Sequence, residues 1–160
     1  SQYMPMFSDQ IALVTGASSG IGKAIAQSLA FNGATVCLIG RRCEALNAAV
    51  GEIQQSGGKA FPCILDLIDD TAIWKLRSMI EEKFGRVNLL IHGAGTFAMA
   101  PIKTATIADF DHLYRTNVRA PYVLTQAFLP LLVPHKSQIV FINSTAGLSA
   151  KAKTGQYAAT

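Results

Sequence analysis

Short apolar runs alternate with amphipathic stretches along most of the chain. Five apolar runs have the length of buried strands: residues 11–15, 35–39, 60–65, 89–91 and 138–142. Helical spacing of apolar residues is found between them: residues 20–31, 43–53, 69–84 and 107–132. Because parallel neighbours need a crossover, strict alternation of this kind predicts an α/β fold whose doubly wound parallel sheet carries helices on both faces.

Apolar residues recur at helical spacing in each of these segments. Ile21, Ile25 and Leu29 follow this spacing, and Leu46, Ala49, Val50 and Ile53 lie on one helical face. Ile73, Leu76 and Ile80 are spaced as a buried stripe, and the long fourth segment contains Leu113, Asn117, Leu124 and Phe128. Asp69-Asp70-Thr71 opens the third helix, because short polar residues there satisfy free backbone N–H groups. The segment from Gly93 to Thr106 is long enough to line a site.

Composition narrows the classes of function. The 160 residues suffice for one domain with a full core, and the net charge of +4 comes from scattered basic residues without the run typical of a nucleic-acid surface. Cys37, Cys43 and Cys63 form neither a CxxC pair nor a ligand-spaced cluster with histidine. We therefore expect reduced thiols in a cytoplasmic protein, with no metal, no nucleic acid and no membrane among its partners.

A glycine-rich turn joins the first predicted strand to its helix. Gly16, Gly20 and Gly22 allow a tight bend and a close approach to a pyrophosphate, and the helix N-terminus supplies free N–H groups. In a doubly wound sheet this first turn is the usual phosphate cradle. The alternative is a glycine-rich turn that binds nothing, and the strand and helix on either side argue against it.

The spacing GxxxGxG in Thr15-Gly16-Ala17-Ser18-Ser19-Gly20-Ile21-Gly22 resembles the motif of the classical short-chain dehydrogenase/reductase family. Asp66 resembles that family's adenine-contacting aspartate. The segment Gly93-Ala94-Gly95 resembles the end of its NNAG segment. The resemblance implies a Rossmann-type domain over residues 1–160, lacking its last elements at the C-terminus. It also implies a set of cofactor-binding residues: Gly16, Ser18, Ser19, Gly20, Ile21, Gly22, Arg41, Arg42, Asp66, Leu67, Gly93, Ala94 and Gly95.

The end of the second strand indicates which nicotinamide cofactor is bound. An acidic residue there suits the ribose hydroxyl of NAD, whereas arginine suits the 2′-phosphate of NADP. Gly40-Arg41-Arg42 therefore predicts NADP(H), although Ser19 stands where many NADP enzymes have a second basic residue. A solvated arginine pair is the alternative. His92 replaces an asparagine of the family, and we expect it to brace the structure, the alternative being a catalytic histidine.

Asn117, Ser144 and Tyr157 fall where the family keeps its active-site residues. The resemblance implies that Tyr157 is the general acid/base, that Ser144 orients the reacting oxygen, and that Asn117 supports a water relay. The family's lysine would fall one residue after Thr160. We expect the 160 residues alone to be inactive for that reason, because a phenol needs a nearby cation to lower its pKa toward neutrality.

The implied function is NADP(H)-dependent interconversion of a small-molecule carbonyl and an alcohol. We expect the complete protein to be a homodimer or homotetramer. Two alternatives remain open: a nucleotide-binding module without turnover, and epimerase or dehydratase chemistry on a similar scaffold. The substrate and the physiological direction are not readable from the sequence.

Overall fold

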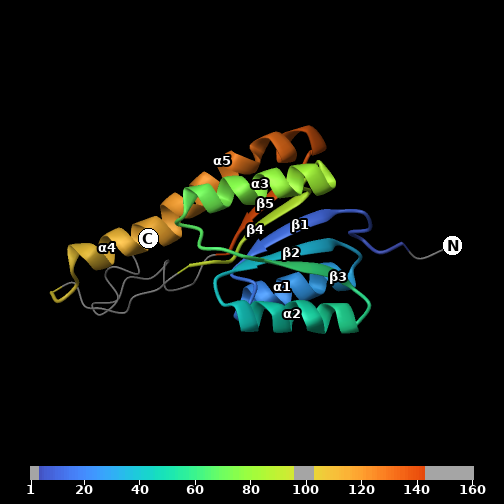
Figure 1. Cartoon of the computed structure of the whole chain (residues 1–160), viewed down its shortest axis with the longest axis horizontal. Helices are drawn as coiled ribbons and strands as arrows, with labels where there is room; N and C mark the ends of the chain where they lie inside the picture. Colours follow the sequence, from blue (N-terminus) through green and yellow to red (C-terminus); the bar gives the residue numbers. More distant parts are fainter. Residues whose placement is uncertain (1–3, 96–102, 143–160) are drawn as a thin grey trace.

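The computed structural model describes residues 4–95 and 103–142, and in these ranges a five-stranded sheet lies between two layers of helices (Figure 1). The strands are β1 (Ile11–Thr15), β2 (Thr35–Gly40), β3 (Lys59–Ile64), β4 (Leu89–His92) and β5 (Gln138–Phe141). They pair in the order β3-β2-β1-β4-β5, and every pair is parallel. The predicted doubly wound sheet is confirmed, and strand ends differ from the prediction by one residue at most.

The helices follow the strands as the pattern predicts. They are α1 (Gly20–Phe31), α2 (Cys43–Gln55), α3 (Asp70–Phe84), α4 (Ile107–Tyr114) and α5 (Ala120–Leu132). Asp69 caps α3 by accepting a hydrogen bond from the Ala72 N–H, and the helix stops at Gly85, whose φ of 72° is left-handed. Thr106 and Asp109 form a capping box at the start of α4.

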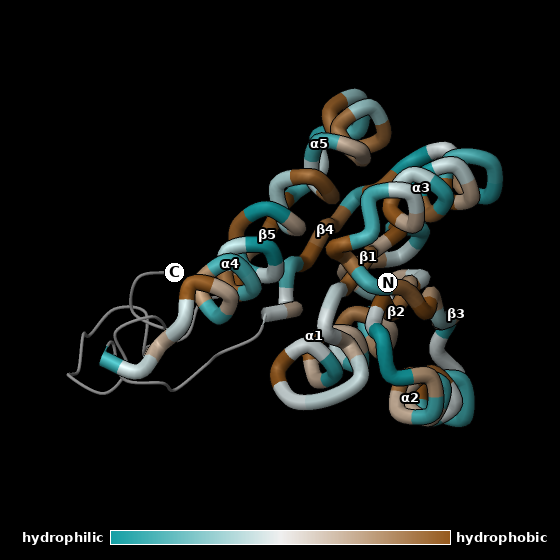
Figure 2. Tube along the Cα trace, turned by 60° about the vertical axis from the view of Figure 1, so that its left-hand side comes forward, coloured by the Kyte–Doolittle hydropathy of each residue, from teal (hydrophilic) through white to brown (hydrophobic). Residues whose placement is uncertain are grey.

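Two apolar cores lie on opposite faces of the sheet. In Figure 1, α1 and α2 cover one face, and α3 and α5 cover the other. Alternate residues of the central strands serve the two cores: Val14 of β1 packs with the α1 and α2 side chains, and Leu13 packs with those of α3 and α5. Figure 2 shows the hydrophobic strand segments between the two helical layers. The central strands are therefore buried on both faces, as parallel strands are in α/β folds.

Most apolar residues at helical spacing are buried, and Ile21 is an exception. Those of α2 and α3, together with Leu113, Leu124 and Phe128, are at most 5% exposed. Ile21, the second residue of α1, has the same spacing as Ile25 and Leu29 but is 64% exposed. Its exposure leaves it on the wall of the cavity described below.

The edges of the sheet are β3 and β5. All four residues of β5 are exposed, with Phe141 at 54%. At the other edge, β3 carries Pro62, a residue that edge strands tolerate because its nitrogen donates no hydrogen bond. No helix in the described ranges is both long and apolar enough to cross a lipid bilayer.

Candidate functional site

The strand order reverses between β1 and β4, and the loops after these two strands meet at that point. β1 continues to β2 and β3 on one side, whereas β4 and β5 lie on the other. The buried Thr15 hydroxyl at the end of β1 accepts hydrogen bonds from the Gly93 and Ala94 N–H groups, both at 3.0 Å. This is where an open α/β sheet has its ligand-binding crevice.

Glycine is required at three positions of this junction. A Cβ at Gly16, whose φ is +63°, would lie 2.5 Å from the Gly93 carbonyl oxygen, and one at Gly93 would lie 2.6 Å from the Thr15 carbonyl oxygen. A Cβ at Gly22 would overlap the Gly16 carbonyl. All three obstructing groups are backbone, which cannot turn aside as a side chain can. The turn therefore forms only if these residues have no side chain.

A cavity of about 760 Å³ opens at this junction, within the size range of ligand pockets. Of the predicted cofactor-binding residues, all but Gly20 line it: Gly16, Ser18, Ser19, Ile21, Gly22, Arg41, Arg42, Asp66, Leu67, Gly93, Ala94 and Gly95. Gly20 begins α1 with φ +58° and faces open space. Predicted site residues from different segments of the sequence thus line one cavity.

The cavity wall also contains residues that the sequence analysis did not assign to it: Ile39, Leu65, Ile68, Thr116, Ala120 and Ile142. Leu65 and Ile68 flank the Asp66-Leu67 pair, so extending that turn by one residue on each side would have included them. Thr116, Ala120 and Ile142 come from the long helical segment and the end of β5, and no local motif marks them. Only the folded chain brings them to the wall.

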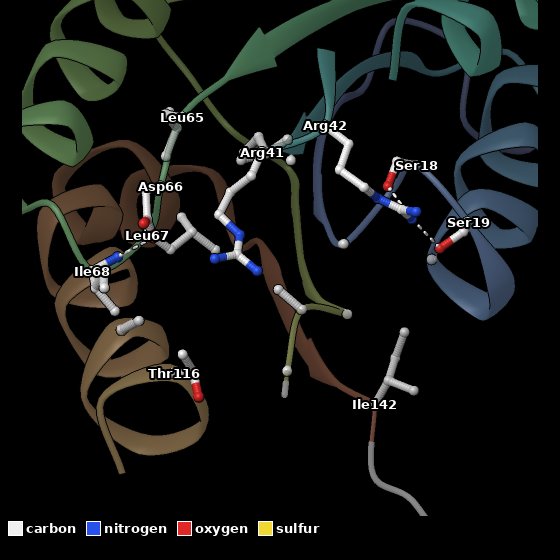
Figure 3. A pocket seen from close by; sticks show the side chains of 18 of the residues that line it. Ser18, Ser19, Arg41, Arg42, Leu65, Asp66, Leu67, Ile68, Thr116 and Ile142 are labelled. Atoms are coloured by element: carbon white, nitrogen blue, oxygen red, sulfur yellow. Dashed lines mark hydrogen bonds between the residues drawn. The ribbon is translucent and has the colours of Figure 1, made fainter. Parts of the chain in front are cut away.

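The two arginines after β2 have different roles in the structure. In Figure 3, the Arg41 side chain points into the cavity, whereas Arg42 turns toward the glycine loop. The Arg42 Nη2 donates hydrogen bonds to the Ser18 hydroxyl at 3.1 Å and the Ser19 hydroxyl at 2.9 Å. Arg42 thereby places a cation beside Ser19, the position at which many NADP enzymes have a second basic residue. Asp66 is the sole acidic side chain among the described residues of this wall.

Ser19 is also the N-cap residue of α1, but its side chain does not cap the helix. Its hydroxyl accepts from Arg42 instead. The first turn of α1 contains no acidic residue. The positive end of the helix dipole is therefore directed toward the cavity without a carboxylate of its own helix to neutralise it, which suits an anionic ligand.

Asp66 and its neighbours form the wall of the cavity that lies across from Arg42 and the glycine loop (Figure 3). The Asp66 carboxylate accepts a hydrogen bond from the Ile68 N–H at 3.1 Å, and the Leu65 N–H donates to the Gly40 carbonyl at 3.0 Å. Through the second bond, the segment after β3 is held against the end of β2. The position of Asp66 and Leu67 in the cavity therefore depends on how β3 pairs with β2.

Asn117 lies in a π-helical segment, Arg115–Arg119, which interrupts the long helix between α4 and α5. The sequence predicted a continuous helix over residues 107–132, and this interruption was not foreseen. Thr116 in this segment and Ala120 directly after it line the cavity wall, and Asn117 is half-buried. Arg119 ties the segment to the start of α3 by two 2.8 Å bonds to the Asp70 carboxylate. π-turns inside helices are frequent at functional sites.

His92, at the end of β4, is 5% exposed and does not line the cavity. Its Nε2 is 2.9 Å from the Thr125 hydroxyl on α5, and its ring stacks on Phe141 of β5 with centroids 4.6 Å apart. Burial lowers the pKa of His92 from 6.5 to about 4, so the ring is neutral near pH 7. The geometry supports the interpretation of His92 as a brace between β4, β5 and α5.

The depressed pKa of His92 predicts how stability depends on pH. Between pH 6.5 and 4 the unfolded chain binds a proton at this position and the folded chain does not, so stability falls as the pH falls through this window. The full effect is about 3 kcal/mol. We expect urea titrations to give a steeper loss of stability from pH 7 to pH 4 for the parent than for His92→Asn. His135→Asn, at an exposed position, should behave as the parent. Equal slopes in all three proteins would contradict the assignment.

Ser144 and Tyr157 lie outside the described residues, as do residues 96–102 of the segment from Gly93 to Thr106. Their predicted roles are considered below as proposals. Within residues 4–95 and 103–142, no three of the side chains of histidine, cysteine, aspartate and glutamate gather as metal ligands would.

Comparisons with known proteins agree with this geometry. The family described as short chain dehydrogenase matches residues 10–160. Gluconate 5-dehydrogenase of Gluconobacter oxydans is 37% identical over 150 residues, which are 93% of this chain and 59% of that protein. The chain spans 42% to 63% of the length of the first three curated relatives it matches.

Two solved structures resemble the chain closely. A short chain dehydrogenase from Shigella flexneri complexed with NADP has a TM-score of 0.90 and 34% identity, and the match covers 98% of this chain and 68% of that one. A 7α-hydroxysteroid dehydrogenase complexed with NADH and 7-oxo glycochenodeoxycholic acid has a TM-score of 0.91 and 32% identity, over 98% of this chain and 61% of that one. Structures with this fold therefore include complexes with both nicotinamide cofactors.

Proposed function

Because this chain belongs to the short-chain dehydrogenase family, whose match spans residues 10–160, we propose that it is the nucleotide-binding part of an NADP(H)-dependent oxidoreductase. The reaction we propose is the interconversion of a small-molecule carbonyl and an alcohol by hydride transfer. One observation carries the proposal: a cavity of about 760 Å³ lies at the reversal of strand order, and its base is a turn in which backbone obstructs any side chain at Gly16, Gly22 and Gly93.

The described residues fit a dinucleotide. The glycine turn and the uncapped start of α1 would hold the pyrophosphate, where backbone N–H groups and the helix dipole favour negative charge. Asp66 and Leu67 would contact the adenine, and Arg41 and Arg42 the ribose phosphate. When bound, the nicotinamide cofactor supplies or accepts the hydride. The protein's part is to orient the reactants and to move one proton.

Cofactor choice follows from charge at the end of β2. Gly40 has no carboxylate to accept a ribose hydroxyl or to repel a phosphate. The guanidinium of Arg41 points into the cavity, and that of Arg42 is held at the glycine loop by two serine hydroxyls. Two cations of fixed planar geometry at one end of the cavity favour a ligand with a phosphate there.

For catalysis we propose the three residues named from the sequence. The Tyr157 hydroxyl would give a proton to the substrate oxygen during reduction and take it back during oxidation. Ser144 would hold that oxygen by a hydrogen bond, and Asn117 would support the relay that returns the proton. The π-helical segment around Asn117 lies on the cavity side of the long helix, because its neighbours Thr116 and Ala120 line the wall.

The cofactor proposal is tested by Arg41→Asp. The change removes a charge-assisted hydrogen bond and adds a carboxylate that suits a ribose hydroxyl, so we expect the preference between NADPH and NADH to invert. Such a bond contributes about 1.5–3 kcal/mol, so NADPH affinity should fall by roughly tenfold or more. Isothermal titration calorimetry with both cofactors measures the two affinities directly.

Lys59→Asp is the matched control, because it makes the same charge change at the start of β3, and the cavity lies at the opposite end of the strands. We expect the control to retain the parent's preference. Tighter binding of NADH than of NADPH by the parent protein would contradict the proposed cofactor. Binding of neither cofactor would contradict the proposed site.

Two further expectations stay predictions. Exposed apolar side chains follow the long helix, among them Ile107, Phe110, Tyr114, Val118 and Tyr122. This surface is consistent with self-association of the chain as a homodimer or homotetramer.

A cytoplasmic location is likewise a prediction from the sequence.

A further inference from the structure

Two cysteines that are 26 residues apart in the sequence touch in the fold. The Cys37 thiol on β2 donates a hydrogen bond to the Cys63 sulfur on β3, with 3.2 Å between the sulfur atoms. In the strand register Cys37 pairs with Phe61 and Ile39 pairs with Cys63, so the two cysteines are diagonal neighbours on the same face of the sheet. Neither cysteine has a role predicted from the sequence, and the proposed reaction does not use them.

The surroundings of the two sulfurs differ. Cys37 is fully buried in the core against α3 and α5, and burial raises its pKa well above the ordinary thiol value. Cys63 lies on the edge strand and is partly exposed. The hydrogen bond donated by Cys37 lowers the pKa of Cys63, against the effect of burial, and the Lys83 ammonium lowers it further. Cys63 is thus the sulfur that solvent reaches and that more readily forms a thiolate.

Lys83 is fixed near this pair by aromatic rings. Its Nζ lies 4.4 Å from the ring centroid of Phe61 and 5.3 Å from that of Phe84, and the two rings stack at 5.7 Å. Phe61 is on the same strand as Cys63, two residues before it. A cation held in this way favours the negative form of a nearby thiol.

We propose that Cys63 and Cys37 are a reversible oxidation site for hydroperoxides. The Cys63 thiolate attacks the peroxide oxygen, the O–O bond breaks, and the sulfur becomes a sulfenic acid while the peroxide leaves as water or alcohol after taking a proton. The Cys37 sulfur then attacks the Cys63 sulfur, the S–OH bond breaks, and the hydroxyl leaves as water with the Cys37 proton. The two sulfurs together lose two electrons, which reduce the peroxide.

The resulting disulfide would be easily reduced. A disulfide places its sulfurs about 2.05 Å apart, whereas the Cys37 and Cys63 sulfurs are 3.2 Å apart. Forming the bond therefore requires β3 to shift toward β2. The edge strand can shift because it pairs on one side only. Strained, accessible disulfides are the ones that cellular thiols reduce readily.

A shift of β3 would reach the candidate nucleotide site. Cys63 is two residues before Leu65, and Leu65 is followed by Asp66 and Leu67 on the cavity wall. The Leu65 N–H is bonded to the Gly40 carbonyl, so this wall is anchored at the strand pair that the disulfide would distort. We expect oxidation to lower nucleotide affinity by roughly fivefold or more, a typical coupling between two sites. This link rests on the proposed function, whereas the oxidation site itself does not.

The test treats the reduced protein with hydrogen peroxide, alkylates the remaining thiols and maps the peptides by mass spectrometry. We expect a Cys37–Cys63 disulfide in the parent and in Cys43→Ser, reversed by dithiothreitol. Cys43 is the matched control, because it is exposed and has no cysteine in contact among the described residues. In Cys37→Ala, dimedone should trap a sulfenic acid on Cys63, and Lys83→Met should slow its formation several-fold.

Oxidation of Cys43 with the other two cysteines unchanged would overturn the proposal, as would a Cys63 that reacts no faster than Cys43. The nucleotide link is measured separately, by calorimetric titration of the oxidised and reduced parent with NADPH. Equal affinities of the two forms would refute the link. If the reduced protein binds no nucleotide while the disulfide forms, the proposed function fails and the oxidation site stands.

Discussion

Replacing Tyr157 with phenylalanine is expected to lower kcat by roughly 10²- to 10⁴-fold, the usual contribution of a positioned general acid. The prediction applies to a chain that continues through the lysine position expected after Thr160. Only the transferable proton is removed, so NADPH affinity should stay close to that of the parent. Steady-state oxidation of NADPH with a panel of ketones and aldehydes gives kcat, and calorimetric titration gives the affinity. Ser144→Ala should cost less than the tyrosine change, because it removes one orienting hydrogen bond.

His92→Asn is the informative control for this prediction. His92 directly precedes Gly93, but it is buried, neutral near pH 7 and in contact with Thr125 and Phe141. We therefore expect His92→Asn to keep most of the turnover. Retention of turnover by Tyr157→Phe together with its loss in His92→Asn would mean that the proton comes from the histidine, and the proposed mechanism would be wrong.

Gly22→Ala is expected to destabilise the fold and to abolish nucleotide binding at practical concentrations. The new methyl group would overlap the Gly16 carbonyl and lie 3.2 Å from the Thr15 carbonyl oxygen, so the turn after β1 would have to move away from α1. Overpacking of this kind costs about 1–3 kcal/mol. The displaced turn also carries the N–H groups that would meet the pyrophosphate. Urea denaturation measures the first effect, and calorimetric titration with NADPH measures the second.

Gly51→Ala in α2 provides the matched comparison. Gly51 also lies inside a helix, but no heavy atom is within 4 Å of the position of an added Cβ. Alanine there should stabilise the protein by up to about 1 kcal/mol, because it favours the helix over glycine, and should leave nucleotide affinity unchanged. If Gly22→Ala were as stable as Gly51→Ala and bound NADPH equally well, the close contact between the glycine turn and α1 would have no part in the site.

Much of the fold was predictable because its determinants are local or periodic. The runs that form the strands are apolar and β-branched, and the helix stripes repeat every three or four residues. The glycine spacing marked the cradle, since backbone contact at Gly16 and Gly22 allows no other residue. Gly40 and Arg41 were predicted to select the cofactor because of their place at the end of β2, and both line the cavity.

Other features of the site were decided by contacts between segments distant in the sequence. Arg42 bonds to Ser18 and Ser19 because the start of α2 lies beside the glycine loop. Thr116 lines the cavity from within the π-helical segment, and no residue pattern distinguishes that turn from its neighbours.

Short-range spacing along the chain specified the alternation of strands and helices and the glycine turn, whereas the set of candidate cofactor residues came from the resemblance to the family. The environment of individual side chains depends on the folded chain: His92 is buried and its pKa is lowered, Ile21 is exposed on the cavity wall, and Cys37 and Cys63 are in contact. Burial and sulfur-to-sulfur distance depend on how β2, β3 and β4 pair and on what covers them. Strand pairing joins residues at any separation along the chain, so these properties arise only when the chain is folded.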